Sequence, residues 1–244
     1  MEGTSKKVAL VTGANKGIGF EVARQLGRGG CTVLLGARNV ALGKAAEAKL
    51  KSEGLDARFV ELDLVRTETI EAASALITRE FGRLDILVNN AAIGDRGDGP
   101  PSRASAEAVQ RIFQTNFFGT LAVTKSMLPL VRKAPAGRIV NVSSGLGSLK
   151  LNGDPEWMGA AYKHIGYCGS KAALNMLTVH LAYELRDTAI KVNSADPGYT
   201  ATDLNGNRGF QTVEQGAAET VRLSLLAADG PTGGFFATAG PEPW

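Results

Sequence analysis

Short apolar segments rich in β-branched residues alternate along this chain with longer segments whose apolar positions recur at helical spacing. The short segments are typical of strands buried on both faces of a parallel sheet, and the longer ones of amphipathic helices. We expect strands at Val8–Thr12, Thr32–Leu35, Arg58–Leu62, Ile86–Val88, Arg138–Val142, Lys191–Asn193 and Phe235–Ala237. We expect helices at Phe20–Leu26, Ala41–Leu50, Ile70–Phe81, Val109–Leu130, Ala172–Leu185 and Val213–Ala227.

This alternation predicts the fold class. Repeated strand–helix–strand units bring parallel strands into one sheet and cover both of its faces with helices. No repeat or linker interrupts the pattern, so we expect one domain over residues 1–244. The prediction is an α/β fold, a doubly wound parallel sheet with helices on both faces.

Three segments do not follow the pattern: Gly94–Arg103, Leu146–Gly166 and Tyr199–Phe210. Each follows a predicted strand, and loops at the carboxyl ends of parallel strands form the ligand crevice of such sheets. We expect these three segments to form the walls of a substrate site. The side chains available for an apolar pocket are those of Leu146, Trp157, Met158, Tyr162, Tyr199 and Phe210.

Composition narrows the class of partner. The 44% hydrophobic and 21% charged residues are ordinary for a globular protein. A net charge of +3, with no run of like charges, does not resemble a nucleic-acid-binding surface. The first apolar run is too short to span a membrane and has no signal-peptide pattern, so we expect a cytoplasmic protein with a small-molecule partner.

The cysteines and histidines predict no metal site. Cys31 and Cys168 are too few and too far apart for a metal cluster or a disulfide framework, which agrees with a reducing compartment. His164 and His180 fit no ligand pairing, and we interpret them as structural residues.

A glycine-rich turn follows the first predicted strand and leads into a helix. Gly13 permits a tight turn, Gly17 lets the backbone approach a pyrophosphate, and Gly19 lets helix and strand pack closely. The remaining turn positions expected to contact a dinucleotide are Asn15, Lys16 and Ile18. The alternative for a glycine triplet alone is a turn that binds nothing.

The residues at the end of the second predicted strand indicate which dinucleotide the chain binds. An acid there would bind the adenosine ribose and repel a 2′-phosphate, but the sequence is Leu34-Leu35-Gly36-Ala37-Arg38-Asn39. Arg38 and Lys16 could together bind a 2′-phosphate, which favours NADP(H) over NAD(H). The alternative is that both are solvated surface cations.

Tyr167 and Lys171 lie four residues apart at the start of a predicted helix and therefore share a face. A phenol is a poor acid or base at neutral pH, and a nearby ammonium favours its ionised form. A tyrosine on a helix face more often serves packing. Ser143 and Ser144, at the end of the fifth predicted strand, could stabilise a substrate oxyanion or merely form a turn.

The chain resembles the short-chain dehydrogenase/reductase family. The resemblance rests on Thr12 followed by the glycine spacing of the first turn, and on these motifs occurring in the family's order over residues 8 to 202. The resemblance implies a Rossmann fold in which Tyr167 donates a proton, Ser144 orients the carbonyl oxygen and Lys171 binds the nicotinamide ribose. It also implies that Asn116 is a fourth catalytic residue, which holds a water in a proton relay from Lys171.

Further cofactor contacts follow from the same resemblance. Asn89-Asn90-Ala91-Ala92 resembles the family's Asn-Asn-Ala-Gly element, with Ala92 in place of glycine. Asp63 is expected near the adenine, although an aspartate there would equally serve as a turn or N-cap residue. The complete set of expected contacts outside the glycine turn and Arg38 is Asp63, Leu64, Asn89, Ala91, Tyr167, Lys171, Pro197, Gly198, Thr200 and Thr202.

Within the family, Asn15-Lys16, Ala37-Arg38 and the long Leu146–Gly166 segment resemble the NADPH carbonyl reductases. The implied reaction is reversible reduction of a ketone or aldehyde by NADPH. The alternatives are an NAD-dependent alcohol or hydroxysteroid dehydrogenase and a non-enzymatic NADP(H)-binding regulator. The resemblance allows a homo-oligomer, dimer or tetramer, and equally a monomer, and the sequence does not name the carbonyl substrate.

Overall fold

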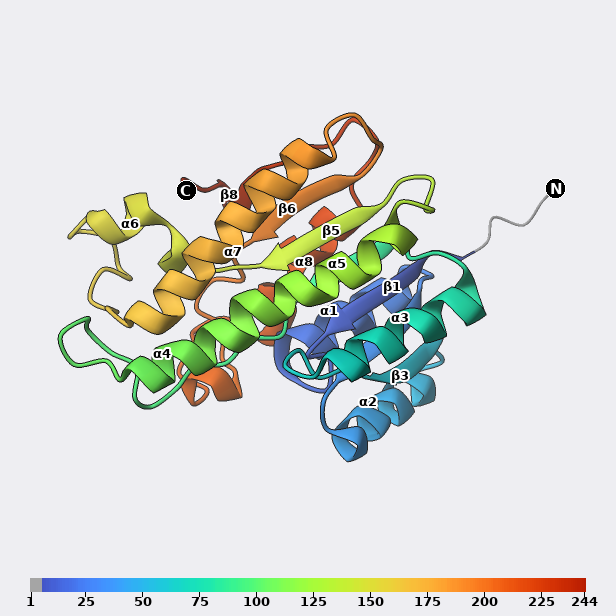
Figure 1. Ribbon diagram of the computed structural model, residues 1–244, viewed down its shortest axis with the longest axis horizontal. Coiled ribbons are helices and arrows are strands. Elements are labelled where there is room, and N and C mark those ends of the chain that lie inside the picture. Colours follow the sequence, from blue (N-terminus) through green and yellow to red (C-terminus); the bar gives the residue numbers. More distant parts are fainter. Residues whose placement is uncertain (1–5) are drawn as a thin grey trace.

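The computed structural model describes residues 6–244 and contains one eight-stranded sheet (Figure 1). The strand order is β3-β2-β1-β4-β5-β6-β7-β8, with every neighbouring pair parallel except β7 and β8. The strands are β1 Val8–Thr12, β2 Thr32–Ala37, β3 Ala57–Glu61, β4 Ile86–Asn89, β5 Arg138–Val142, β6 Lys191–Ala195, β7 Phe235–Ala237 and β8 Gly240–Pro241. The predicted sheet is confirmed, and the antiparallel β8 is an addition to it.

Helices cover both faces, as expected. The principal helices are α1 Gly17–Arg28, α2 Val40–Ser52, α3 Thr67–Phe81, α4 Ala106–Phe113, α5 Thr120–Val131, α7 Ile165–Glu184 and α8 Val213–Ser224. One apolar core packs α1, α2 and α8 against the sheet, and a second packs α3, α5 and α7 against the other face. The strands supply both cores because successive side chains point to opposite faces.

The helix expected at Val109–Leu130 is wrong in two respects. It starts earlier, at Ala106, where Ser105 accepts a hydrogen bond from the Ala108 N–H, and its middle is a π-helix, η1 Gln114–Gly119. A π-helix has about one more residue per turn than an α-helix. Over so short a stretch this difference does not visibly change the spacing of the apolar residues, so the sequence gives no clear sign of the π-helix.

Two of the three expected loops contain short helices. Residues 146–166 include part of η2 Gly145–Gly147 and all of α6 Leu149–Gly153, and residues 199–210 include η3 Asp203–Asn205. These segments, with α4 and the start of α7, lie together beyond the carboxyl end of the sheet (Figure 1). The substrate walls expected from the sequence are therefore at one end of the molecule.

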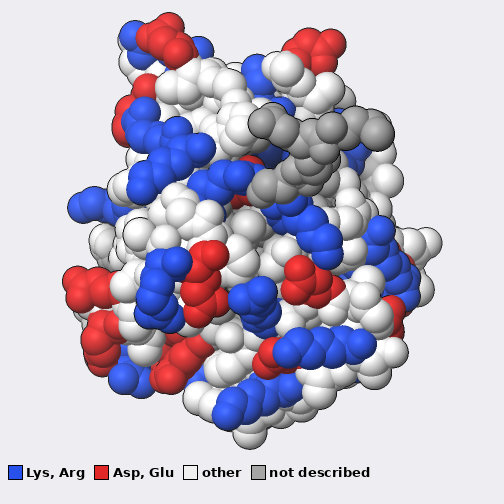
Figure 2. All heavy atoms as spheres, turned by 90° about the vertical axis from the view of Figure 1, so that its right-hand side faces the viewer, with Lys and Arg blue, Asp and Glu red and all other residues white. Residues whose placement is uncertain are grey.

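The opposite end has a different surface. Figure 2 shows basic and acidic side chains interspersed there, with neither sign forming an uninterrupted field. Over residues 6–244, no helix is long and apolar enough to cross a membrane. Residues 1–5, which belong to the N-terminal stretch in which we expected no leader, lie outside the described residues.

Candidate functional site

The glycine turn joins β1 to α1 in a conformation that glycine favours. Gly13 and Gly17 have φ values of +65° and +58°, a region that side chains other than glycine rarely adopt. A Cβ on Gly19 would lie 2.7 Å from the Gly13 carbonyl oxygen and would collide with the Asn90 amide. The backbone is thus drawn tightly around the start of α1, where Lys16 is the N-cap and its side chain makes no capping bond. This helix N-terminus can bind an anion.

Asn90 holds this turn, although we did not single it out as a site residue. Its side-chain amide donates to the Thr12 carbonyl oxygen at 2.8 Å, and its backbone N–H donates to Thr12 Oγ1 at 2.9 Å. Thr12 Oγ1 also accepts from the Ala91 N–H at 2.9 Å. The signal was present in the Asn-Asn-Ala-Ala motif, but the motif alone does not say which asparagine faces the turn.

The two predicted 2′-phosphate cations have different surroundings. Arg38 is exposed at the end of β2, and its guanidinium makes no hydrogen bond or ion pair within residues 6–244. Lys16 Nζ instead lies 2.6 Å from Asp203 Oδ2, and both side chains are about three-fifths exposed. This ion pair connects the glycine turn with η3 and holds the Lys16 ammonium beside a carboxylate.

The predicted adenine-side residues lie on the turns after β3 and β4. Asp63 forms a turn in which Oδ1 accepts from the Val65 N–H at 3.2 Å, and Leu64 is buried in the core. The Asn89 side chain is also buried, where its amide donates to Thr124 Oγ1 and Asn141 Oδ1. The Asn89 side chain therefore faces the core, and only its backbone is left for the predicted cofactor contact.

Ser144 and Tyr167 come together at the carboxyl end of β5, as expected. Their side chains are neighbours, and Ser144 Oγ accepts from the Leu146 N–H at 3.2 Å. Burial, followed by the negative charge of Asp196, raises the pKa of the Tyr167 phenol far above its ordinary value, and the neighbouring Ser144 hydroxyl only partly opposes this. In this state the phenol keeps its proton at neutral pH.

Lys171 completes the cluster from one turn further along α7. It is almost fully buried, its Nζ donates to the Val142 carbonyl oxygen at 2.7 Å, and it lies 5.7 Å from the centre of the Tyr167 ring. Burial lowers the pKa of the Lys171 ammonium to about 8, against the opposing effect of Asp196. The ammonium thus adjoins both the tyrosine and the end of β5.

Asn116 lies in the π-helix η1, and its side chain bridges two other segments. Oδ1 accepts from the Ile93 N–H at 2.8 Å, while Nδ2 donates to the Ile93 carbonyl oxygen at 3.0 Å and to Ser170 Oγ at 3.1 Å. The side chain therefore links the loop after β4 to α7 beside the tyrosine. Its role in a proton relay stays a prediction.

Asp98 fixes the start of the helix that carries Tyr167, and sequence reasoning missed it. Its buried carboxylate accepts from the Gly166 and Tyr167 N–H groups, each at 2.8 Å. Acceptors at a helix N-terminus satisfy N–H groups that have no partner inside the helix. No local pattern could reveal this cap, because Asp98 lies 68 residues from Gly166.

The Pro197-Gly198 turn after β6 faces the serine loop. Asp196 Oδ1 accepts from the Gly198 N–H at 3.0 Å, and Gly198 has a φ of +67°. Thr200 is buried and donates to the Pro197 carbonyl oxygen at 2.9 Å, so its hydroxyl serves the turn itself. Thr202 is partly exposed, and its methyl group lies 3.7 Å from the Cβ position of Gly17. The structure thus brings Thr202 to the glycine turn.

One aromatic side chain from the predicted walls contacts the tyrosine, and two others contact each other. The Tyr162 ring contacts that of Tyr167 edge-on, with centroids 6.4 Å apart, and Tyr199 contacts Phe210 at 5.9 Å. Tyr162, Tyr199 and Phe210 are all substantially exposed. Leu146 and Trp157 lie against the serine loop, whereas Met158 is 79% exposed. The rim of the site is therefore apolar and aromatic.

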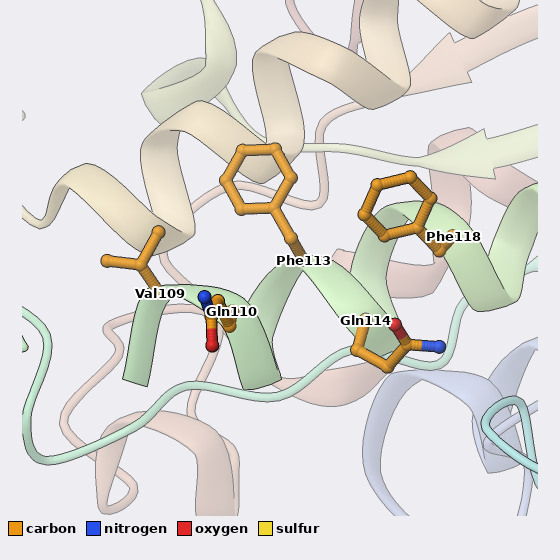
Figure 3. Close-up of a pocket in the computed structure, with 5 residues that line it drawn as sticks. All are labelled: Val109, Gln110, Phe113, Gln114 and Phe118. Atoms are coloured by element: carbon orange, nitrogen blue, oxygen red, sulfur yellow. The ribbon is translucent and has the colours of Figure 1, made fainter. Parts of the chain in front are cut away.

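Two hollows lie outside this cluster. One of about 430 Å³ is lined by Val109, Gln110, Phe113, Gln114 and Phe118 on the α4–η1 face (Figure 3). The other, of about 240 Å³, lies between α6 and the side of α7 that carries Cys168 and Ala172. Neither is lined by Ser144 or Tyr167. No group of three or more potential metal ligands occurs among the described residues.

Comparison with known proteins agrees with this geometry. The model of the short chain dehydrogenase family matches residues 7–212. Carbonyl reductase [NADPH] 1 of Mus musculus is 36% identical, and the match covers 99% of each chain. Salutaridine reductase from Papaver somniferum superposes with a TM-score of 0.83 at 30% identity, covering 96% of this chain and 100% of that one. NADPH-bound carbonyl reductase from chicken fatty liver gives a TM-score of 0.85 at 25% identity, covering 98% and 94%.

Proposed function

The chain belongs to the short-chain dehydrogenase family, and from this premise we propose that it is an NADPH-dependent carbonyl reductase that reduces ketones or aldehydes. The observation that carries the proposal is the Ser144–Tyr167–Lys171 cluster at the carboxyl end of the sheet. Relatives named as NADPH carbonyl reductases support both the reaction and the cofactor.

The residues present fit this cofactor. The α1 N-terminus has no side-chain cap, Gly13 and Gly17 give the turn its tight conformation, and β2 is followed by Arg38 rather than by an acid. The turn and α1 would hold the pyrophosphate, and Arg38 would bind the 2′-phosphate with Lys16. Lys171 would bind the nicotinamide ribose. When bound, NADPH supplies the hydride.

Side chains of the protein supply the proton that the reduction of a carbonyl group needs. Tyr167 keeps its proton because burial raises its pKa, so it can donate to the oxygen of a carbonyl group as negative charge develops there. Ser144, beside Tyr167, would donate a second hydrogen bond to that oxygen. The positive charge of Lys171 stabilises the phenolate that remains. The aromatic rim favours an apolar carbonyl compound.

Tyr167→Phe tests the reaction. The change removes the proton donor and keeps the ring, so we expect kcat to fall by at least about 100-fold. The assay follows oxidation of NADPH against a panel of ketones, aldehydes and quinones. Tyr183→Phe, at a site 69% exposed on the same helix, is the matched control. Undiminished turnover by Tyr167→Phe would refute the mechanism.

Arg38→Ala tests the cofactor. Loss of the guanidinium should raise KM for NADPH on the order of tenfold or more and leave KM for NADH nearly unchanged, since only NADPH carries the 2′-phosphate. Arg79→Ala, which removes another exposed arginine, should alter neither value. Equal losses with both cofactors would favour the alternative of an NAD-dependent dehydrogenase.

A further inference from the structure

The residues after β8 fold back toward the active site. The Glu242 N–H donates to the Phe235 carbonyl oxygen at 2.8 Å, and the Trp244 ring stacks on Phe235 with centroids 5.5 Å apart. The Trp244 carbonyl oxygen accepts from the Lys150 N–H at 3.2 Å. These contacts hold residues 242–244 between β7 and α6, and they bring the Glu242 side chain to the end of β6.

There Glu242 meets Asp196. The two carboxyl groups lie side by side, and Glu242 Oε2 is buried with no hydrogen-bond donor facing it. Asp196 accepts from the Gly198 N–H at 3.0 Å, and its Oδ2 lies 3.2 Å from the Cβ position of Gly145. Asp196 thus joins three segments, namely the Pro197-Gly198 turn, the loop that begins at Ser144 and the residues after β8.

Two carboxylates in contact cannot both stay charged without a large cost, so one proton must lie between them. Burial, and then the charge of Asp196, raises the pKa of Glu242 to about 7. Burial also raises the pKa of Asp196, although its backbone hydrogen bonds and the Lys171 charge oppose this. The other titratable groups that act on Asp196, or that it acts on, are Lys171 and Tyr167 on α7.

We propose that Glu242 is a positioning residue of this active site, which shares one proton with Asp196 and thereby holds the Ser144 loop against the Pro197-Gly198 turn. When the proton is lost, repulsion between the two carboxylates loosens the loop that carries Ser144. The kinetic consequence rests on the proposed function, whereas the shared proton does not.

The direction of the pH effect follows from the raised pKa of Glu242. The folded protein holds this proton more tightly than the unfolded chain does, so its contribution to stability is complete below the ordinary value of 4.5 and is lost as pH rises through about 7. Glu242→Gln provides an amide that donates to Asp196 at every pH and does not titrate. Glu242→Ala removes the contact at every pH.

Thermal unfolding of the protein without added cofactor tests the shared proton. Between about pH 5.5 and about pH 8.5, the Tm of the wild type should fall by about 3–6 °C relative to that of Glu242→Gln. Glu71→Gln removes an exposed carboxylate on α3 and should show the wild-type pH dependence. If the difference in Tm between the wild type and Glu242→Gln is the same at both pH values, the proposal is overturned.

Kinetics test the positioning. Glu242→Ala should lower kcat on the order of tenfold with a smaller change in KM for NADPH, because misplacement of Ser144 weakens stabilisation of the developing charge. Glu242→Gln should restore kcat and flatten its decline between about pH 6 and about pH 8. Wild-type kcat and pH profile in Glu242→Ala would refute the positioning role. If no carbonyl compound is reduced, the proposed function fails, while the Tm comparison still decides whether the proton is shared.

Discussion

At the scale of single residues, burial changes the two partners on α7 in opposite directions. It raises the pKa of Tyr167 because the phenolate is the charged form, and it lowers the pKa of Lys171 because the ammonium is the charged form. Without cofactor, the site is therefore biased toward a neutral tyrosine and a lysine that titrates near pH 8. This bias suits an enzyme that donates a proton to a carbonyl oxygen.

The loss of the Lys171 charge as pH rises should have opposite effects on activity and on stability. As pH rises through about 8, Lys171 loses its charge, so kcat/KM for reduction should fall. Its folded pKa is below the ordinary 10.5, so the cost of burying the ammonium, present below about pH 8, disappears as pH approaches 10.5. We expect the free energy of unfolding to gain up to about 3 kcal/mol from this group over that range.

Initial rates and urea unfolding between about pH 7 and about pH 10.5 check both signs. Lys171→Met should lose the alkaline gain in stability, and the exposed control Lys44→Met should keep it. The same gain in Lys171→Met as in the wild type would contradict the assignment.

Candidate site residues were recognisable from the sequence where they lie in compact motifs. Tyr167 and Lys171 are four residues apart, Ser144 follows a predicted strand, and the structure brings the three together. Asp98 and Glu242 were not recognisable, because each acts on residues distant in the sequence and neither sits in a distinctive local pattern. The Asn89 side chain shows the opposite limitation. It was found by a motif match, but a motif match does not reveal whether a side chain faces the core or the ligand site.

At the scale of elements, the N-terminus of α7 is the point on which the geometry of the tyrosine depends. Because Asp98 accepts two of its first N–H groups, the position of Tyr167 is set by the loop after β4 as well as by the packing of α7 itself. The predicted helix Ala172–Leu185 covers only the later part of α7, which begins at Ile165, and no local pattern in the sequence shows the Asp98 contact that fixes this start.

Asp98→Ala should therefore impair both stability and catalysis. Loss of a buried cap that accepts several N–H groups should cost about 1–3 kcal/mol in the free energy of unfolding. Displacement of Tyr167 should lower kcat more than it raises KM for NADPH. Denaturant titration and steady-state kinetics measure these effects. Asp187→Ala, at a side chain 86% exposed, is the control, and equal stability in the two variants would contradict the capping role.

The connection between the glycine turn and η3 predicts competition. Lys16 forms an ion pair with Asp203, so the Asp203 carboxylate would compete with a 2′-phosphate for its ammonium. In Asp203→Asn, Lys16 is released in advance, and Kd for NADPH should fall on the order of twofold, the scale of an exposed ion pair. Kd for NADH should stay the same.

Fluorescence titration at low and high ionic strength measures these constants, and the difference between cofactors should shrink with added salt. Glu156→Gln removes an exposed carboxylate from the 146–166 segment and serves as the control. An equal change in the Kd of NADH would show that Asp203 acts through the loop rather than through Lys16.

At the scale of the whole molecule, one sheet joins every segment of the site, and this leads to a prediction about cooperativity. If residues 1–244 form a single domain, unfolding should be one transition that NADPH shifts as a unit. With free NADPH at 100 times its Kd, the stabilisation is about 2.7 kcal/mol, which for a chain of this size is about 5–10 °C in Tm. NADH at the same concentration should shift Tm less.

Calorimetry with each cofactor checks both statements. Two transitions, of which only one responds to NADPH, would contradict a single domain. A larger shift with NADH than with NADPH would contradict the assignment of the cofactor.

The doubly wound parallel sheet was predictable because alternating apolar runs and helical segments, joined by right-handed crossovers, leave few arrangements of such a chain. The short β8 was not, because two residues, one of them a proline, carry no periodic signal. The same two residues determine whether another strand can pair with this edge of the sheet.

An unpaired strand normally offers a row of backbone donors and acceptors to which another chain can add. Here one margin is β8, only Gly240–Pro241, and a proline has no N–H to offer. The other is β3, where Arg58 and Glu61 are exposed and Arg58 is paired with Glu80. Charges and proline at the two margins oppose edge-to-edge growth into extended β aggregates, so this enzyme is protected from that route of self-association while its helical faces stay available for contact.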